Sequence, residues 1–116
     1  MALTSNIIRG TIILAELQGT GSQQTGIRPC LVVSNNKANT YSPVIVAVPL
    51  TSKTKKYIPT HVSLRPSTNN GLTVTSTALT EQLITINKTS VKKVMGVISK
   101  DDETNVNNAL KISLAI

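Results

Sequence analysis

The sequence contains no phenylalanine, no tryptophan and a single cysteine, and these absences limit the folds and sites that it can form. Without large aromatic side chains, the core must consist of isoleucine, leucine, valine and alanine, and β-branched residues of this kind favour strands. One cysteine excludes an internal disulfide and a thiolate cluster for a metal. Cys30 lies in an apolar run, so we expect it to be a small buried hydrophobic residue.

Acidic residues and histidine are scarce as well, with five acids and one histidine in 116 residues. A zinc site, a carboxylate cage for magnesium and a Ser-His-Asp triad all need more of these side chains, or a different placement of them. Gly21 and Gly26 have the spacing of a phosphate-binding loop, but Ile27-Arg28-Pro29 follows where that motif needs Lys-Ser/Thr and a helix. The sequence therefore predicts no metal and no cofactor.

No apolar run reaches the ~18 residues that span a bilayer, and the N-terminus lacks the apolar core of a secretion signal. We therefore expect a cytoplasmic protein without a membrane partner.

The net charge of +7 is unevenly distributed. Residues 1–100 carry eleven lysines and arginines against Glu16 and Glu81, a net charge of +9, while residues 101–116 carry three acids against Lys111. A basic body suits an anionic partner, such as nucleic acid, an acidic protein or a membrane surface. Solubility alone explains the same composition equally well.

The length predicts one domain over residues 1–116, and alternating apolar residues predict short strands. Strands are expected at residues 7–17, 28–34, 44–50 and 60–64, across 72–87 with an interruption near Glu81, and at 92–99; residues 34–43 are expected to form a loop or one helical turn. The last segment predicts a helix capped by Ser99, with Asp102 and Glu103 in its first turn. This order indicates a small curled antiparallel sheet or barrel closed by a terminal helix.

Polar and basic side chains lie at the ends and irregularities of the expected strands. Arg28 follows the uncharged segment 18–26 and is held by Pro29 and a strand. Cationic and hydroxyl groups without a metal suit the recognition of a phosphodiester. The other members of this set are Thr51, Ser52, Lys53, Lys55 and Lys56 in the basic loop, His61 at a strand start, and Glu81 with Gln82 at the interruption.

Several segments, in this order, resemble the MazF/PemK toxin family, and in particular its members from Gram-positive bacteria. They are IRGTIILAEL (8–17), GSQQTGIRPCLVVSNNKANTYSPVIVAVPLTSKTKKYIPTHV (21–62), LTEQLITINK (79–88) and LKISLAI (110–116). The individual segments are weak signals, but together they are specific and cover nearly the whole chain.

The resemblance implies an SH3-like barrel with a terminal helix, assembled as a homodimer. It implies the toxin of a type II toxin–antitoxin system, a metal-independent endoribonuclease that cuts single-stranded RNA or mRNA at a short sequence. In such enzymes the ribose 2′-hydroxyl attacks the adjacent phosphate, which leaves a 2′,3′-cyclic phosphate and a 5′-hydroxyl. The cognate antitoxin is an acidic protein whose disordered tail lies over the RNA groove.

By position, the family's catalytic arginine matches Arg28 and its catalytic threonine matches Thr51. We expect the loop 18–26 to move to admit RNA, or to be displaced by antitoxin, while Pro29 fixes Arg28. A wider set is expected to contact RNA: Ser22, Gln23, Gln24, Ser52, Lys53, His61, Glu81 and Gln82.

Some positions depart from the family pattern, and some roles stay open. Thr11, Gln23 and Asn87 replace acidic residues and Ile84 replaces an arginine, so the recognised RNA sequence does not carry over from the family. Thr51 can instead bond to backbone, His61 can be a base or a structural residue, and Glu81 with Gln82 can contact bases or antitoxin. The second class of function is a non-catalytic RNA- or protein-binding module of the same superfold, such as a gyrase poison.

Overall fold

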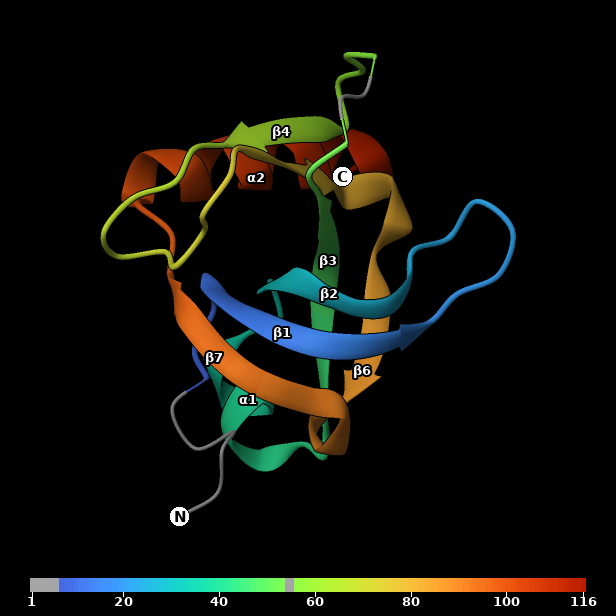
Figure 1. Ribbon diagram of the computed structural model, residues 1–116, viewed down its shortest axis with the longest axis vertical. Coiled ribbons are helices and arrows are strands. Elements are labelled where there is room, and N and C mark those ends of the chain that lie inside the picture. The colour runs from blue at the N-terminus through green and yellow to red at the C-terminus, as the bar shows by residue number, and fades with distance from the viewer. Residues whose placement is uncertain (1–6, 54–55) are drawn as a thin grey trace.

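The computed structural model describes residues 7–53 and 56–116, which form a seven-stranded antiparallel sheet with a C-terminal helix (Figure 1). The strands are β1 (Thr11–Gln18), β2 (Thr25–Val32), β3 (Val44–Thr51), β4 (His61–Leu64), β5 (Ser76–Leu79), β6 (Ile84–Asn87) and β7 (Val91–Val97). The helices are α1 (Asn36–Tyr41) and α2 (Lys100–Leu114), and the 3-10 turns are η2 (Thr80–Gln82) and η3 (Lys88–Ser90). The expected mainly β architecture, an antiparallel sheet with a C-terminal helix, is confirmed.

The strands follow the order β4-β5-β3-β2-β1-β7, and β6 pairs with β3. The sheet curls strongly but does not close into a barrel, since β4 and β7 at the two ends of the strand order do not pair with each other (Figure 1). A backbone contact covers part of the β7 edge instead: the Val97 amide donates to the Asn69 carbonyl at 2.8 Å. Gly96 permits this approach, because an added Cβ would lie 2.2 Å from the same carbonyl oxygen.

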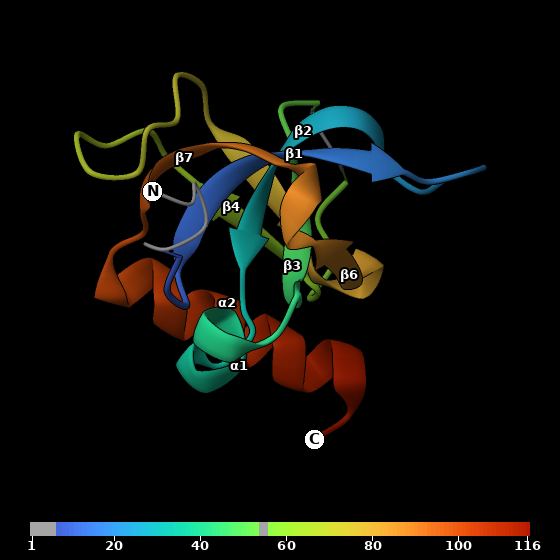
Figure 2. The ribbon, with the colours of Figure 1, turned by 90° about the horizontal axis from the view of Figure 1, so that it is seen from below.

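Apolar side chains bury against both faces of the sheet. On one face, Leu31, Val48 and Leu50 pack with Val106 and Leu110 of α2, which runs beneath the sheet beside α1 (Figure 2). A second cluster on the opposite face contains Ile13, Cys30, Val32, Ile45 and Ala47. Each large aliphatic side chain contributes roughly 1.5–3 kcal/mol on burial. Without aromatics, the fold depends on many such contributions.

Cys30 is fully buried, as expected. This burial raises the pKa of its thiol to about 12, so the group stays protonated. A buried thiol of this kind is inert and serves as a small hydrophobic residue.

The terminal helix begins and ends as its sequence indicates. The Asp102 amide donates to the Ser99 side-chain oxygen at 3.1 Å, and three acids occupy the first turn. These carboxylates complement the positive end of the helix dipole. Ala115 ends the helix with a φ of 58°.

The strand boundaries differ from the expected ones in the first third of the chain. Strand β1 begins at Thr11 and not at residue 7, because Gly10 takes a φ of +94° and ends a turn. Arg9 serves a tertiary role there: its Nε donates to the Val33 carbonyl at 2.9 Å and a terminal nitrogen to Asn107 Oδ1 at 2.8 Å. Strand β2 begins at Thr25 and not at residue 28, so Pro29 lies inside it, next to the residue where pairing with β3 ends.

The remaining expectations hold with smaller shifts. Segment 34–43 contains the helical turn α1, and the buried strand β3 extends to Thr51. Residues 72–75 are not strand, and the interruption near Glu81 is the turn η2 between β5 and β6. Lys55 of the basic loop lies outside the described residues.

Candidate functional site

A groove of about 440 Å³ lies beneath the loop that joins β1 to β2. This loop, residues 19–24, projects from the body of the molecule (Figure 1). The walls of the groove come from the end of β1, the loop, η2 and β6. Four of the residues expected to bind a ligand line it: Gln23, Gln24, Glu81 and Gln82.

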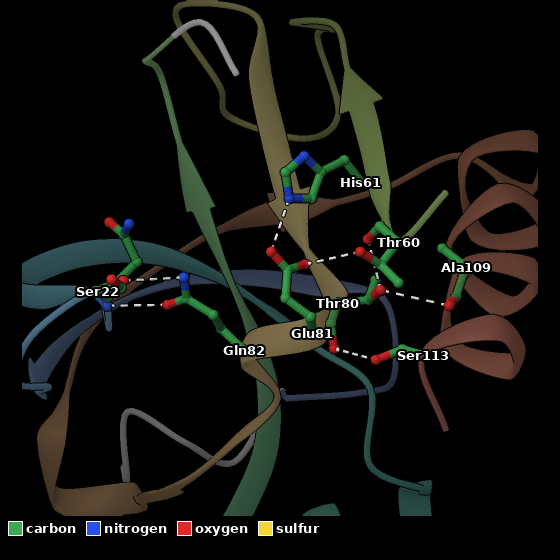
Figure 3. Close-up of polar contacts among 9 residues, drawn as sticks. Ser22, Thr60, His61, Thr80, Glu81, Gln82, Ala109 and Ser113 are labelled. Atoms are coloured by element: carbon green, nitrogen blue, oxygen red, sulfur yellow. Dashed lines mark hydrogen bonds and ion pairs between the residues drawn. The ribbon is translucent and has the colours of Figure 1, made fainter. Parts of the chain in front are cut away.

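Gln82 connects the turn η2 to the loop through both ends of its carboxamide (Figure 3). The Gln24 amide donates to Gln82 Oε1 at 3.0 Å, and Gln82 Nε2 donates to the Ser22 carbonyl at 3.2 Å. These contacts join residues that lie 58 and 60 positions apart in the chain. The loop is therefore held over the groove by one side chain.

Glu81 connects the same turn to the start of β4 (Figure 3). His61 Nε2 lies 2.8 Å from Glu81 Oε2, and the Thr60 hydroxyl donates to Glu81 Oε1 at 3.2 Å. His61 Nδ1 is buried and has no hydrogen-bond partner within the described part of the chain. The sequence analysis named His61 and Glu81 separately, and the structure shows that they contact each other.

The Glu81 carboxyl group has a pKa below its ordinary value of 4.5. Burial acts to raise this pKa, but the hydrogen bond from His61, a bond to its own backbone, the charge of His61 and the bond from Thr60 together outweigh it. A carboxylate held in this way is favoured in the folded state.

We expect Glu81→Gln to reduce the dependence of stability on pH below about pH 5. Because the pKa of Glu81 is lowered on folding, its stabilisation is present above the unfolded pKa and is lost as the pH falls through the folded pKa. The contribution is below about 1 kcal/mol, since the side chain is 38% exposed and solvent screens the pair. Urea unfolding of wild type and variant from pH 7 to pH 3 measures it.

The control for this measurement is Glu16→Gln, which removes the same charge from another glutamate. If the difference between wild type and Glu81→Gln stays constant from pH 6 to pH 3 after that correction, the His61–Glu81 contact does not stabilise the fold.

Thr80 holds η2 in place, and the sequence analysis did not identify it. Its hydroxyl is buried and donates to the Thr60 carbonyl at 2.6 Å, and the Ser113 hydroxyl of α2 donates to the Thr80 carbonyl at 3.2 Å (Figure 3). The turn is thus fixed between the start of β4 and the terminal helix. The only signal in the sequence was its position directly before Glu81.

Arg28 and Thr51 lie on neighbouring strands with their side chains on one face. Cys30 of β2 pairs with Pro49 of β3, so alternation puts Arg28 and Thr51, two residues from that pair, on the same face. Arg28 and Thr51 each lie two residues beyond this last pair. The face is the one opposite to the helix-covered core.

The two side chains differ in their freedom. Arg28 is partly exposed, and its Nε donates to the Thr25 carbonyl at 2.9 Å. In residues 7–53 and 56–116, the ion pairs are Arg9–Glu103, His61–Glu81 and Lys92–Glu16, so Arg28 keeps an uncompensated charge there. Thr51 is buried, and its side-chain oxygen accepts from the Lys53 amide at 3.2 Å.

The same register identifies Thr77 and Ser63 as neighbours that the sequence analysis missed. Thr77 of β5 pairs with Thr51 and with Ser63 of β4, so a row of hydroxyl groups runs from Thr51 across the sheet. Ser52 and Lys53 are exposed directly after this row. Arg28, Thr51, Ser22, Ser52, Lys53 and His61 do not line the groove under the loop.

The described residues contain no group of three or more His, Cys, Asp or Glu side chains placed to hold a metal ion. In that same part of the chain, no helix has the length and apolar character needed to cross a membrane.

Comparisons with known proteins give consistent matches over nearly the whole chain. Residues 8–114 match the family described as PemK-like, MazF-like toxin of type II toxin-antitoxin system. The chain is 37% identical over 110 residues to Endoribonuclease MazF from Staphylococcus saprophyticus, with 93% of this chain and 91% of that protein covered.

Solved structures match in fold as well. A mycobacterial endoribonuclease in complex with its cognate antitoxin is 30% identical, with a TM-score of 0.79 over 95% of this chain and 96% of that chain. MazF from Deinococcus radiodurans is 25% identical, with a TM-score of 0.81 over 95% and 97%.

Proposed function

The chain belongs to the PemK-like, MazF-like toxin family of type II toxin–antitoxin systems, and we propose that it is a sequence-specific endoribonuclease acting on single-stranded RNA, including mRNA. The observation that carries this proposal is the placement of Arg28 and Thr51 on one face of adjacent strands, with the Arg28 charge uncompensated by any acid of the described residues. A relative with 37% identity is named an endoribonuclease, which supports the same activity here.

The proposed reaction is a transesterification within the RNA. The 2′-oxygen attacks the adjacent phosphorus as its proton leaves, the bond from phosphorus to the 5′-oxygen breaks, and that oxygen takes up a proton. The products are a 2′,3′-cyclic phosphate and a 5′-hydroxyl. Arg28 stabilises the negative charge on the pentacoordinate phosphate and does not act as the base, because a guanidinium stays protonated in proteins. Thr51 positions an oxygen or relays a proton.

The proposed reaction is independent of metal, because the Arg28 cation stabilises the developing charge directly. Eight further residues take part in RNA binding in this proposal. They are Ser22, Gln23, Gln24, Ser52, Lys53, His61, Glu81 and Gln82, which lie in the loop, after β3, at the start of β4 and in η2.

Incubation of purified protein with RNA in EDTA tests the proposal. Fragments with a cyclic phosphate at one end and a 5′-hydroxyl at the other, cut at one recurring sequence, are the expected products. Binding of RNA without cleavage would instead indicate a non-catalytic module, and cleavage only after addition of a divalent metal would refute the metal-independent chemistry.

RNA affinity should depend strongly on salt. If about three phosphates are neutralised, the logarithm of the association constant should fall against the logarithm of salt concentration with a slope of roughly −2. Affinity should then weaken roughly 15-fold between 50 and 200 mM salt. Fluorescence anisotropy with an RNA that cannot be cleaved measures the slope. Lys53→Ala should make it shallower by about 0.7, whereas Lys37→Ala on α1 should not change it. An affinity that does not depend on salt would contradict an electrostatic RNA site.

A cognate antitoxin should compete with RNA. In this proposal, an acidic and partly disordered antitoxin tail binds the surface that admits RNA, because residues 1–100 carry a net charge of +9. The mycobacterial relative in complex with its cognate antitoxin supports such a partner. Saturating antitoxin should therefore displace labelled RNA, and unchanged RNA binding in its presence would exclude a shared site.

The protein is also proposed to act as a homodimer. Ile112, Leu114 and Ile116 at the end of α2 are about half exposed or more, beside a hollow of about 630 Å³ between α1 and α2. Apolar surface of this kind, rimmed by polar residues, is typical of protein interfaces.

A further inference from the structure

The loop 19–24 has one pair of contacts within itself and a second pair with a side chain from another element. The Gln23 amide donates to the Thr20 carbonyl at 3.0 Å, and the Thr20 amide donates to Gln23 Oε1 at 3.0 Å. The Ser22 carbonyl and the Gln24 amide point instead to Gln82, which binds both (Figure 3). The loop thus presents one acceptor and one donor, side by side, to the Gln82 carboxamide.

The carboxamide of Gln82 offers an adjacent acceptor and donor in one plane. A nucleobase carries the same pattern on its hydrogen-bonding edge, as with N1 and the 6-amino group of adenine or O4 and N3–H of uracil. Proteins that read single-stranded RNA bind such edges of unstacked bases. A ligand that supplies this edge can therefore replace Gln82 without leaving the two backbone groups unpaired.

We propose that the Ser22 carbonyl and the Gln24 amide form a subsite for the hydrogen-bonding edge of one RNA base, and that Gln82 occupies this subsite as a placeholder until RNA binds. This inference rests on the proposed function and assigns the recognition of one RNA base to these two backbone groups. Gln82 then opposes RNA binding in the free protein, because its two hydrogen bonds must break before the base enters.

A peptide strand is a poorer fit to this subsite than a base. A strand that pairs with another needs a series of outward donor and acceptor groups at alternating residues. In the loop, the Thr20 backbone is already paired with Gln23, and the Ser22 carbonyl and Gln24 amide offer one acceptor and one donor to the same carboxamide. The edge of one nucleobase, like the carboxamide of Gln82, has the one donor and one acceptor that bind the Ser22 carbonyl and the Gln24 amide.

The subsite lies next to the proposed catalytic face. Thr25 directly follows Gln24, and its carbonyl accepts the hydrogen bond from Arg28 Nε at 2.9 Å. A base held by the loop therefore brings its own backbone toward Arg28. Occupation of the subsite would select the RNA sequence close to the cleaved phosphate.

The test compares wild type with Gln82→Ala and Gln82→Met, of which the second keeps the side-chain volume. Asn105→Ala is the matched control, because Asn105 is an exposed amide on α2. The probe is an oligonucleotide of the sequence that wild type cuts, with 2′-deoxyribose at the cleaved nucleotide. NMR measures hydrogen exchange at the Gln24 amide, and anisotropy measures the dissociation constant.

In the free protein, Gln24 should exchange faster in both Gln82 variants than in wild type. Binding of the probe should restore its protection in all three proteins. Both variants should bind the probe about tenfold more tightly, since no placeholder has to be displaced and each lost bond has a modest net value. In the Gln82 variants, replacement of one particular base of the probe by an abasic nucleotide should abolish the protection of the Gln24 amide, while replacement of the other bases should leave it.

The inference is wrong if the Gln24 amide of the Gln82 variants stays unprotected when the probe is bound, or if those variants bind the probe no more tightly than wild type does. Protection by an acidic peptide but not by RNA would overturn it in favour of an antitoxin subsite. A failure of the proposed function gives a different result, because wild type then cuts no RNA at all.

Discussion

Arg28→Ala is expected to lower the rate of RNA cleavage about 100- to 1,000-fold and to leave the fold intact. A loss of this size is typical when one preorganised donor to a developing negative charge is removed. Arg28 is partly exposed and makes no ion pair in the described residues, so its loss should not unfold the chain. Single-turnover cleavage of an RNA that contains the target sequence measures the rate, and circular dichroism checks the fold.

Arg65→Ala is the matched control, because it removes the same charge from an exposed arginine outside the site. It should change the rate little. Arg28→Lys should recover only part of the activity, since an ammonium lacks the planar fork of donors. Near-wild-type cleavage by folded Arg28→Ala would refute the assignment and direct the search to His61 and Glu81.

Thr51 provides an independent check on the same face. Thr51→Ala should also slow cleavage, by less than the loss at Arg28. The residue is buried and accepts from the Lys53 amide, so a structural contribution has to be separated from a catalytic one. Thr51→Ser keeps the hydroxyl and should restore the rate, whereas Thr51→Val keeps the shape and should not.

Leu114→Lys is expected to raise the dissociation constant of the homodimer at least about 100-fold. Leu114 is 49% exposed in the isolated chain. A lysine at this position would bring an unpaired charge into the apolar dimer interface, at a cost of several kcal/mol. The lysine suits the last turn of α2, so the helix itself should persist. Sedimentation at micromolar concentration should give twice the 12.3 kDa chain mass for wild type and a monomer for the variant.

Val74→Lys adds the same charge at an exposed valine of the loop before β5 and should remain dimeric. A monomeric wild type would refute the homodimer. A dimeric Leu114→Lys protein beside a dimeric wild type would place the interface elsewhere on the molecule.

Local features of the sequence determined the class of fold. The isoleucine- and valine-rich segments specified strands because β-branched side chains fit a pleated, half-buried surface. Ser99 and the acids after it specified the start of α2, because a cap and the helix dipole act within one turn. The motifs around Arg28 and Thr51 identified the family through residues that are close in the chain.

The tertiary structure alone decided how the parts of the site meet. Gln82 binds a loop about 60 residues away, Arg9 bonds to Asn107 across 98 residues, and Glu81 of η2 pairs with His61 at the start of β4. Such contacts depend on strand register and on the curl of the sheet, which no local pattern encodes. Arg28 and Thr51 share a face for the same reason. The pairing of Cys30 with Pro49 decides which side chains of β2 and β3 lie on the same face, and a shift of this register by one residue would have placed Arg28 and Thr51 on opposite faces.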